Sequence, residues 1–207
     1  MSQSDVIIIG GGPSGVAAAI SMRKAGIKSV TLLEREQHLG GATRHCSHSP
    51  FGMLEFGRVY LGASYGKRLE KEAHKFGIDV RYGHSVARLG DGGELLVSNF
   101  DGLQTLSAKR VLVTTGVRET TRAARLVTGD RPVGVLTTGT LQSYVAFHNM
   151  MPFKRPVIVG SELVTLSAVW TCLSHGARPV AVLEPRKQAL VRAPLNWFPS
   201  LMGIPFH

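Results

Sequence analysis

Apolar and polar residues alternate in blocks along the first half of the chain. Val6–Ile9 and Val30–Leu33 are short, continuous apolar runs, which predict buried strands. The stretch between them is rich in alanine and other apolar residues, and it predicts a helix that follows a glycine-rich turn. The order strand, helix, strand is typical of a βαβ unit with two parallel strands.

A second helix and two further strands extend this unit. Apolar residues recur at near-helical spacing over Tyr60–Phe76, and Gly77 is expected to end the helix. Ile78–Tyr82 then predicts a third parallel strand. Arg110–Thr114 predicts a buried strand that returns the chain to the same sheet.

Between these last two strands the pattern changes to an alternation of apolar and polar residues, which predicts a small antiparallel meander. Asp91-Gly92-Gly93 and Asp101-Gly102 supply its turns. Its three predicted strands are Ser85–Leu89, Glu94–Ser98 and Leu103–Ser107.

The second half of the chain repeats the order strand, helix, strand. A predicted helix over Thr140–Asn149 and the prolines Pro152 and Pro156 precede this repeat. Its elements are the strand Val157–Val159, the helix Leu163–His175 and the strand Pro179–Leu183. We therefore predict an α/β protein with two domains. Residues 1–117 form a Rossmann-like domain with a parallel sheet and an antiparallel three-stranded insert, and residues 118–207 form a partial second Rossmann-like domain.

A glycine-rich turn joins the first strand to the first helix, with the spacing Gly10-x-Gly12-x-x-Gly15. Gly10 permits a tight turn, Gly12 lets a pyrophosphate approach the backbone, and Gly15 lets helix and strand pack closely. Pro13 and Ser14 lie inside this turn. Free N–H groups at the start of a helix favour a bound phosphate, so these residues are candidate cofactor contacts.

Glu34 follows the second strand, at the position where a carboxylate accepts hydrogen bonds from a ribose and repels a 2′-phosphate. Turn, helix, strand and acid together predict a dinucleotide site. The second copy differs, because Glu162 stands at the second glycine position and Thr165 at the third. A phosphate there would meet a negative charge and a bulky side chain. We expect this copy not to bind NAD(P)H in the usual pose; another pose and a purely structural role both stay open.

Composition sets limits on function. Hydrophobic residues make up 43% and charged residues 18% of the chain, and no segment resembles a signal peptide or a membrane span, so we expect a cytoplasmic protein. The net charge of +10 favours anionic cofactors or an acidic partner subunit, whereas a motif that reads nucleic acid is missing. His45, Cys46 and His48 cluster, but no second Cys/His cluster completes a metal site, so no metal is predicted.

Several motifs carry a family resemblance. Glu34-Arg35 followed by Gly40-Gly41, and the insert followed by Thr114-Thr115-Gly116, resemble the FAD domain of the pyridine nucleotide-disulfide reductase superfamily, whose members contain two dinucleotide-binding domains. The resemblance implies FAD as the cofactor. It also implies cofactor contacts for Arg35, Gly41, Arg44, Thr115 and Gly116, and for the backbone of Val86 near the adenine.

The cysteines distinguish this chain from the best-known members of that superfamily. Disulfide reductases need two cysteines a few residues apart against the flavin, whereas Cys46 and Cys172 lie far apart in the sequence. We therefore expect an FAD-dependent oxidoreductase that does not reduce disulfides. No catalytic residue is predicted, because the flavin would carry the redox chemistry.

Later segments resemble a narrower group. Gly40–Gly57, Arg118–Gln142 and the runs GSELVTLSAVWTC and FPSLMGIP are similar to the FAD-binding A or α subunits of opine oxidase, hydrogen cyanide synthase and dye-linked amino-acid dehydrogenases. The resemblance implies a subunit that passes electrons from amine or amino-acid oxidation, carried out by a second oxidoreductase subunit, to an acceptor. The alternatives are a non-catalytic assembly or electron-transfer subunit, an inactive truncated remnant, and an NADH-oxidising flavoprotein.

The resemblance also implies a later segment that returns to the first domain and holds the ribityl-phosphate end of the flavin. The sequence stops at His207, where the next strand is expected to begin. We therefore expect a fragment whose flavin site is incomplete on its own. The sequence identifies neither the substrate nor the electron acceptor.

Overall fold

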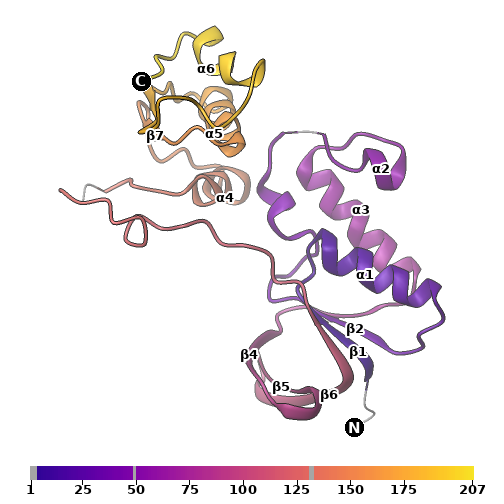
Figure 1. Cartoon of the computed structure of the whole chain (residues 1–207). Helices are drawn as coiled ribbons and strands as arrows, with labels where there is room; N and C mark the ends of the chain where they lie inside the picture. The colour runs from indigo at the N-terminus through magenta and orange to yellow at the C-terminus, as the bar shows by residue number, and fades with distance from the viewer. Residues whose placement is uncertain (1–3, 49, 131–132) are drawn as a thin grey trace. The chain divides into compact units, whose positions relative to one another are not determined.

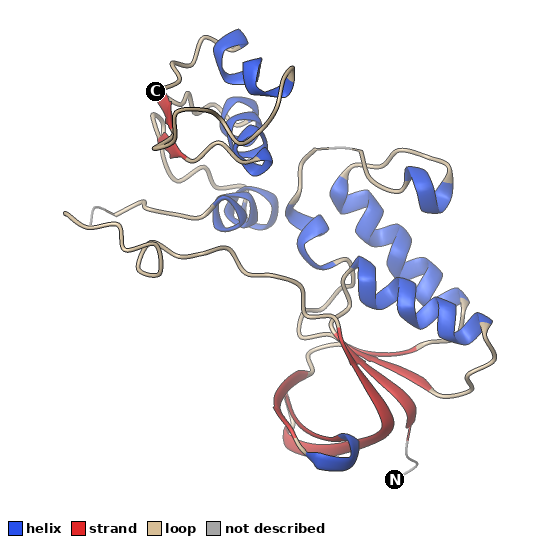
Figure 2. Ribbon diagram, viewed as in Figure 1, coloured by secondary structure: helices blue, strands red, loops and turns tan. Residues whose placement is uncertain are grey.

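The computed structural model describes residues 4–48, 50–130 and 133–207. The chain divides into two compact units, one of residues 1–44 and 49–117 and the other of residues 45–48 and 118–207. Figure 1 follows the chain through both units, and Figure 2 shows helices and strands in each. Within the described residues, no helix is long and apolar enough to cross a membrane.

The first unit is built on a six-stranded sheet of order β3-β2-β1-β6-β5-β4. Its strands are β1 (Ser4–Ile9), β2 (Val30–Leu33), β3 (Asp79–Arg81), β4 (Ser85–Leu89), β5 (Glu94–Asn99) and β6 (Gly102–Val113). β1 pairs in parallel with β2 and β6, and β2 with β3, whereas β5 pairs antiparallel with β4 and β6. The predicted α/β fold with a parallel sheet and an antiparallel three-stranded insert is confirmed.

One strand differs from the sequence-based expectation. β6 is continuous over 12 residues, where two strands, Leu103–Ser107 and Arg110–Thr114, were predicted. Its first half pairs with β5 and its second half with β1. Lys109 interrupts the apolar pattern of this segment. Its ammonium group projects from the strand and lies 2.7 Å from the Asp5 carboxylate, so the strand can continue through this residue. The second half is also less buried than predicted, since Val113 is 53% exposed.

Helices cover one face of this sheet. α1 (Pro13–Lys24) and α3 (Gly62–Lys75) pack against each other and over the strands, with η1 (Gly41–His45) and the short α2 (Met53–Phe56) between them in sequence. The core on this side includes Ile8, Val16, Ala19, Leu32 and Ala73, which are almost completely buried. A second core cluster contains Ile7, Leu33, Leu95, Val97 and Ala108. The turn between β4 and β5 is the 3-10 segment η2 (Asp91–Gly93).

The second unit repeats the βαβ order on a smaller scale. Its elements are α4 (Thr138–His148), β7 (Val157–Val159), α5 (Leu163–Ser174), β8 (Ala181–Leu183), η3 (Leu195–Trp197) and α6 (Phe198–Leu201). β7 and β8 pair in parallel, and the last residues of the chain lie beside β8, where the Val182 N–H donates to Pro205 at 2.8 Å. Val169, Val182 and Ile204 form one almost completely buried cluster in this unit, and Leu141, Val145, Cys172 and Ala177 form another buried cluster.

Residues 45–48 belong to this second unit, although the sequence analysis placed them in the first domain. The ring of His45 meets the ring of Phe147 edge-on, with centroids 6.2 Å apart. A long-range ring contact of this kind has no signature in the local sequence.

Candidate functional site

The glycine turn after β1 is closed tightly against the end of β6. Gly10 has φ +105°, and a Cβ there would lie 2.5 Å from the Thr114 carbonyl oxygen. A Cβ on Gly15 would lie 2.0 Å from the Gly10 carbonyl oxygen and 2.7 Å from Thr114 Oγ1. The Thr114 hydroxyl donates to the carbonyls of Ile9 and Gly10, at 2.9 Å each. Both glycines are therefore required by packing within the protein.

Gly12 is different, because no atom lies within 4 Å of the position of its Cβ. Its φ of −71° is open to any residue, so neither packing nor backbone conformation explains a glycine here. Gly12 caps α1 without a side-chain hydrogen bond, Pro13 begins the helix, and the first turn contains no acidic residue. Ser14 is exposed beside it. The start of α1 therefore offers open space and uncapped backbone N–H groups, as a pyrophosphate site requires.

The Gly40-Gly41 segment returns to this turn from the end of β2. The Gly40 N–H donates to the Gly11 carbonyl at 2.8 Å, and a Cβ on Gly41 would lie 3.1 Å from Gly12 Cα. The aliphatic stem of Arg44 packs near Gly40, 3.2 Å from the position of its Cβ. These contacts make Gly40 and Gly41 neighbours of the glycine turn, although they lie some way along the sequence, and Arg44 packs against Gly40.

Glu34 is buried at the end of β2, with 6% of its surface exposed. One carboxylate oxygen accepts the Gly11 N–H at 2.8 Å, and the other accepts the Glu36 N–H at 2.9 Å. A carboxylate has about four lone-pair sites, so each oxygen keeps one for a further donor. The two backbone hydrogen bonds hold the group in a fixed orientation beside the turn, which suits recognition of a ribose diol.

Sequence reasoning missed Gly11 and Leu39, which complete the contact between the turn and the acid. A Cβ on Gly11 would lie 2.4 Å from Leu39 Cδ2 and 2.9 Å from Glu34 Oε2, so a side chain at residue 11 would displace the carboxylate. The glycine fingerprint does not specify a residue type at Gly11. Leu39 is a buried leucine after the acid, and in the sequence it resembles any other core residue. Neither residue therefore had a sequence signal.

The other predicted site residues lie outside the turn, although Thr115 approaches it, with its Cα 3.3 Å from the position that a Cβ on Gly10 would take. Arg35 is exposed, and its Nε lies 3.5 Å from Glu36 Oε1. Val86 pairs with Val97 in the antiparallel part of the sheet. Thr115 and Gly116 are exposed immediately after β6, where the hydroxyl that contacts the turn comes from the preceding Thr114.

The corresponding turn of the second unit is filled by its own side chains. The Glu162 carboxylate lies over Gly160, 2.5 Å from the position of its Cβ, and makes no capping hydrogen bond to α5. Ser161 donates its hydroxyl to Glu184, the acid at the end of β8, and accepts the Leu190 N–H at 2.9 Å. The hydrogen bond from Ser161 lowers the pKa of the Glu184 carboxyl below its ordinary value.

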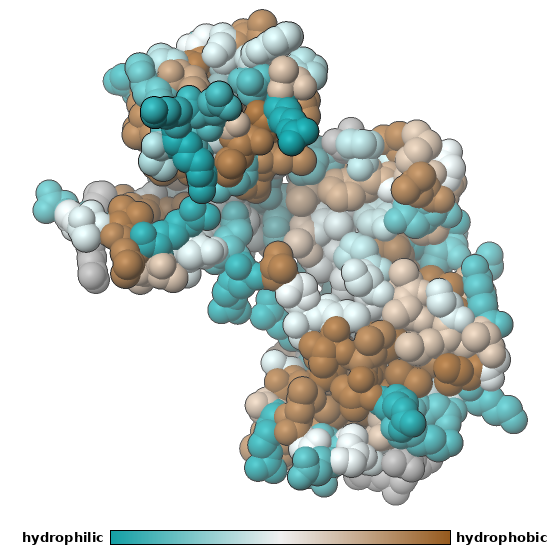
Figure 3. Space-filling view, viewed as in Figure 1, coloured by the Kyte–Doolittle hydropathy of each residue, from teal (hydrophilic) through white to brown (hydrophobic). Residues whose placement is uncertain are grey.

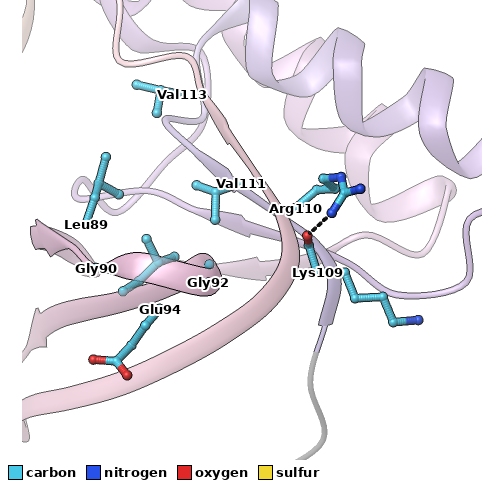
Figure 4. A pocket seen from close by; sticks show the side chains of 10 residues that line it. Leu89, Gly90, Gly92, Glu94, Lys109, Arg110, Val111 and Val113 are labelled. Carbon is cyan, nitrogen blue, oxygen red and sulfur yellow. Dashed lines mark hydrogen bonds between the residues drawn. The ribbon is translucent and has the colours of Figure 1, made fainter.

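A cavity of ≈ 460 Å³ opens elsewhere in the first unit, between the β4–β5 turn and the second half of β6 (Figure 4). Leu89, Leu95 and Val111 line it, and the Arg110 guanidinium donates to the Lys109 carbonyl at 2.8 Å on its rim. Within the described chain, residues 109–113 pair with β1 and with no other strand. The space-filling view shows apolar surface gathered over this part of the sheet (Figure 3). No predicted cofactor residue lines the cavity.

An open glycine turn at the start of a helix, with a fixed carboxylate at the end of the neighbouring strand, defines a dinucleotide-binding protein of the Rossmann class. The chain matches the pyridine nucleotide-disulphide oxidoreductase family over residues 4–195, and it belongs to that family. Family membership supports FAD as its cofactor.

Curated relatives extend well beyond this chain. It is 32% identical over 189 residues to hydrogen cyanide synthase subunit HcnB of Pseudomonas aeruginosa, a match that covers 86% of this chain and 38% of that protein. It is 23% identical over 204 residues to an opine oxidase subunit of Rhizobium meliloti, covering 98% of this chain and 43% of that protein. The chain thus spans less than half the length of these relatives.

Solved structures share the fold. L-proline dehydrogenase from P. horikoshii superposes with a TM-score of 0.67 at 20% identity, covering 92% of this chain and 37% of that one. Thioredoxin reductase from Lactococcus lactis superposes with a TM-score of 0.66 at 18% identity, covering 99% of this chain and 64% of that one.

Proposed function

We propose that this chain is an FAD-binding oxidoreductase subunit that passes electrons from amine or amino-acid oxidation, carried out by a partner subunit, to an acceptor. The observation that carries the proposal is the contrast between the two glycine turns. The first leaves open space at Gly12 beside a fixed acid, Glu34. The second is filled by Glu162, and its acid, Glu184, is bonded within the protein.

In this proposal the cofactor's charged and polar groups have named partners. The N–H groups at the start of α1 hold the pyrophosphate, Glu34 accepts the ribose hydroxyls, and the loop at Gly41 and Arg44 adjoins the phosphates. Thr115 and Gly116 follow β6 toward the flavin end, and the backbone of Val86 adjoins the adenine. FAD bound there supplies the redox chemistry. The protein's part is to hold and orient it.

The partner subunit is proposed from the relatives. The matched hydrogen cyanide synthase and opine oxidase chains are each named as subunits, and the name of the second indicates oxidative chemistry. The net charge of +10 supports an acidic partner surface. A disulfide reductase activity is disfavoured, because Cys46 and Cys172 do not form a closely spaced pair in the sequence.

The test is to purify the chain together with its partner and to record flavin spectra after anaerobic mixing with amino acids, with amines or with NADH. We expect an amine or amino acid to bleach the flavin of this chain only when the partner is present. The variant Gly12→Val shows which subunit holds the flavin that bleaches, since it should remove the flavin of this chain and leave any flavin of the partner.

Two results would contradict the proposal. Rapid bleaching by NADH in the isolated chain would make it an NADH-oxidising flavoprotein. A complex with the same flavin content in wild type and Gly12→Val would show that the chain contributes no flavin through this turn, which would favour an assembly subunit or an inactive remnant.

A further inference from the structure

Phe100 occupies the two-residue turn between β5 and β6, and 88% of its surface is exposed. Turns of this kind favour glycine, asparagine and aspartate, and an exposed phenyl ring adds nothing to a core. The other phenylalanine and tyrosine rings in the described part of the first unit are buried or half-buried. Phe100 therefore departs from the local rule while its ring stays largely exposed, which is typical of a binding residue.

This turn is anchored beside the segment that carries Glu34. The Asn99 amide Nδ2 lies 3.4 Å from His84 Nε2, and the His84 N–H donates to the Glu34 carbonyl at 3.0 Å. The Phe100 ring lies over Gly83, with Cε2 2.9 Å from the position that a Cβ would take. Gly83 has φ +67° and no side chain, so the ring reaches the backbone directly.

The order of groups across this edge of the sheet matches the order of groups in a dinucleotide. The first position is the glycine turn, and the second is the Glu34 carboxylate, which accepts the Gly11 N–H. The third position is the segment of residues 83–84, whose N–H groups donate to the backbone of residues 34–36. Phe100 covers that third position. In FAD the pyrophosphate, ribose and adenine follow each other in the same sequence. A pyrophosphate at Gly12 and a ribose at Glu34 therefore direct the base toward Phe100.

We propose that the exposed ring of Phe100 is the stacking surface for the adenine base of FAD. This inference rests on the proposed FAD site and adds to it the residue that recognises the base. A phenyl ring stacks on the π-face of adenine and shields it from water, and it replaces the cost of an exposed aromatic side chain with a favourable contact. Stacking of one base on an aromatic side chain corresponds to about a 5- to 150-fold change in affinity.

The test measures FAD and ADP affinity by titration calorimetry on the flavin-stripped full chain and three variants, Phe100→Ala, Phe100→Trp and Leu103→Ala. Leu103 is the matched control, because it is an exposed apolar residue of the same hairpin, at 68% exposure. We expect Phe100→Ala to weaken FAD and ADP by the same factor, about 10-fold. Phe100→Trp should retain wild-type affinity, and Leu103→Ala should change neither ligand. Circular dichroism should show all variants folded.

Each outcome has a separate meaning. A wild-type chain that does not bind ADP would overturn the proposed cofactor site and this inference together, because all the residues proposed for the ADP half of the cofactor lie in this chain. FAD binding that is equal in wild type and Phe100→Ala would overturn the role of Phe100 alone. Loss of FAD affinity with unchanged ADP affinity would also overturn it, because the adenine half is common to both ligands.

Discussion

Replacing Gly12 by alanine should separate cofactor binding from folding. A Cβ at Gly12 meets no atom within 4 Å, and the φ of −71° suits alanine. Restricting the unfolded chain stabilises the variant by about 0.4–1 kcal/mol. Replacing a glycine cap by alanine costs about 0.5–1 kcal/mol, since alanine is a poor helix cap. These effects offset each other, so the free energy of unfolding of the apoprotein should change by less than about 1 kcal/mol.

The same methyl group would occupy the space that the pyrophosphate needs. A displaced pyrophosphate loses at least one charge-assisted hydrogen bond to the start of α1, worth about 1.5–3 kcal/mol. The Kd for FAD should therefore rise about 10- to 150-fold. Gly15→Ala is the contrasting variant, because its Cβ would lie 2.0 Å from the Gly10 carbonyl oxygen. That overlap forces α1 away from β1 and should cost about 1–3 kcal/mol or more in stability.

The assays are urea unfolding of the apoproteins, followed by circular dichroism, and calorimetric titration with FAD. The reasoning predicts that Gly12→Ala unfolds at the wild-type urea midpoint and binds FAD weakly, while Gly15→Ala unfolds early. Wild-type FAD affinity in Gly12→Ala would refute the assignment of the pyrophosphate to this turn. Early unfolding of Gly12→Ala would refute the conclusion that this glycine serves the ligand alone.

Three further predictions concern buried polar groups and a thiol. Glu34→Ala leaves the buried Gly11 N–H without its acceptor, so the free energy of unfolding, measured in urea, should fall by about 1–3 kcal/mol. Burial raises the pKa of the Cys172 thiol to about 11, so iodoacetamide should label it at pH 8 only after unfolding, and its contribution to stability should decline as pH rises from 9.0 toward 11. Labelling of Cys172 in the folded chain, located by peptide mapping to distinguish it from the half-buried Cys46, would contradict this. The lowered pKa of Glu184 stabilises the fold above its ordinary value of 4.5, and this contribution is lost as pH falls below that value. Glu184→Gln should therefore unfold at lower urea than wild type at pH 7, with a smaller difference at acidic pH; an equal difference at both would exclude a role for ionisation.

Sequence patterns predicted the elements well where the periodicity of apolar residues and the turn-forming residues act over a few positions of the chain. Val30–Leu33 and Val157–Val159 are strands with the predicted bounds, and Ser85–Leu89 is the first strand of the insert, as expected. The predicted helix over Tyr60–Phe76 forms as the slightly shorter Gly62–Lys75. β6 was harder to predict, because a strand that changes partners along its length has no boundary in its own sequence.

The candidate site shows the same difference between features set by local sequence and features set by long-range contacts. The sequence alone determined the glycines at residues 10, 12 and 15 and the acid at residue 34, because each depends on a residue type at a fixed local spacing. Only the tertiary structure showed that two of these glycines are required by packing while Gly12 faces open space. It also fixed the bond from Gly11 to Glu34, the position of Phe100 over Gly83 and the filling of the second turn by Glu162. These features depend on contacts between residues far apart in the chain, and no local pattern encodes them.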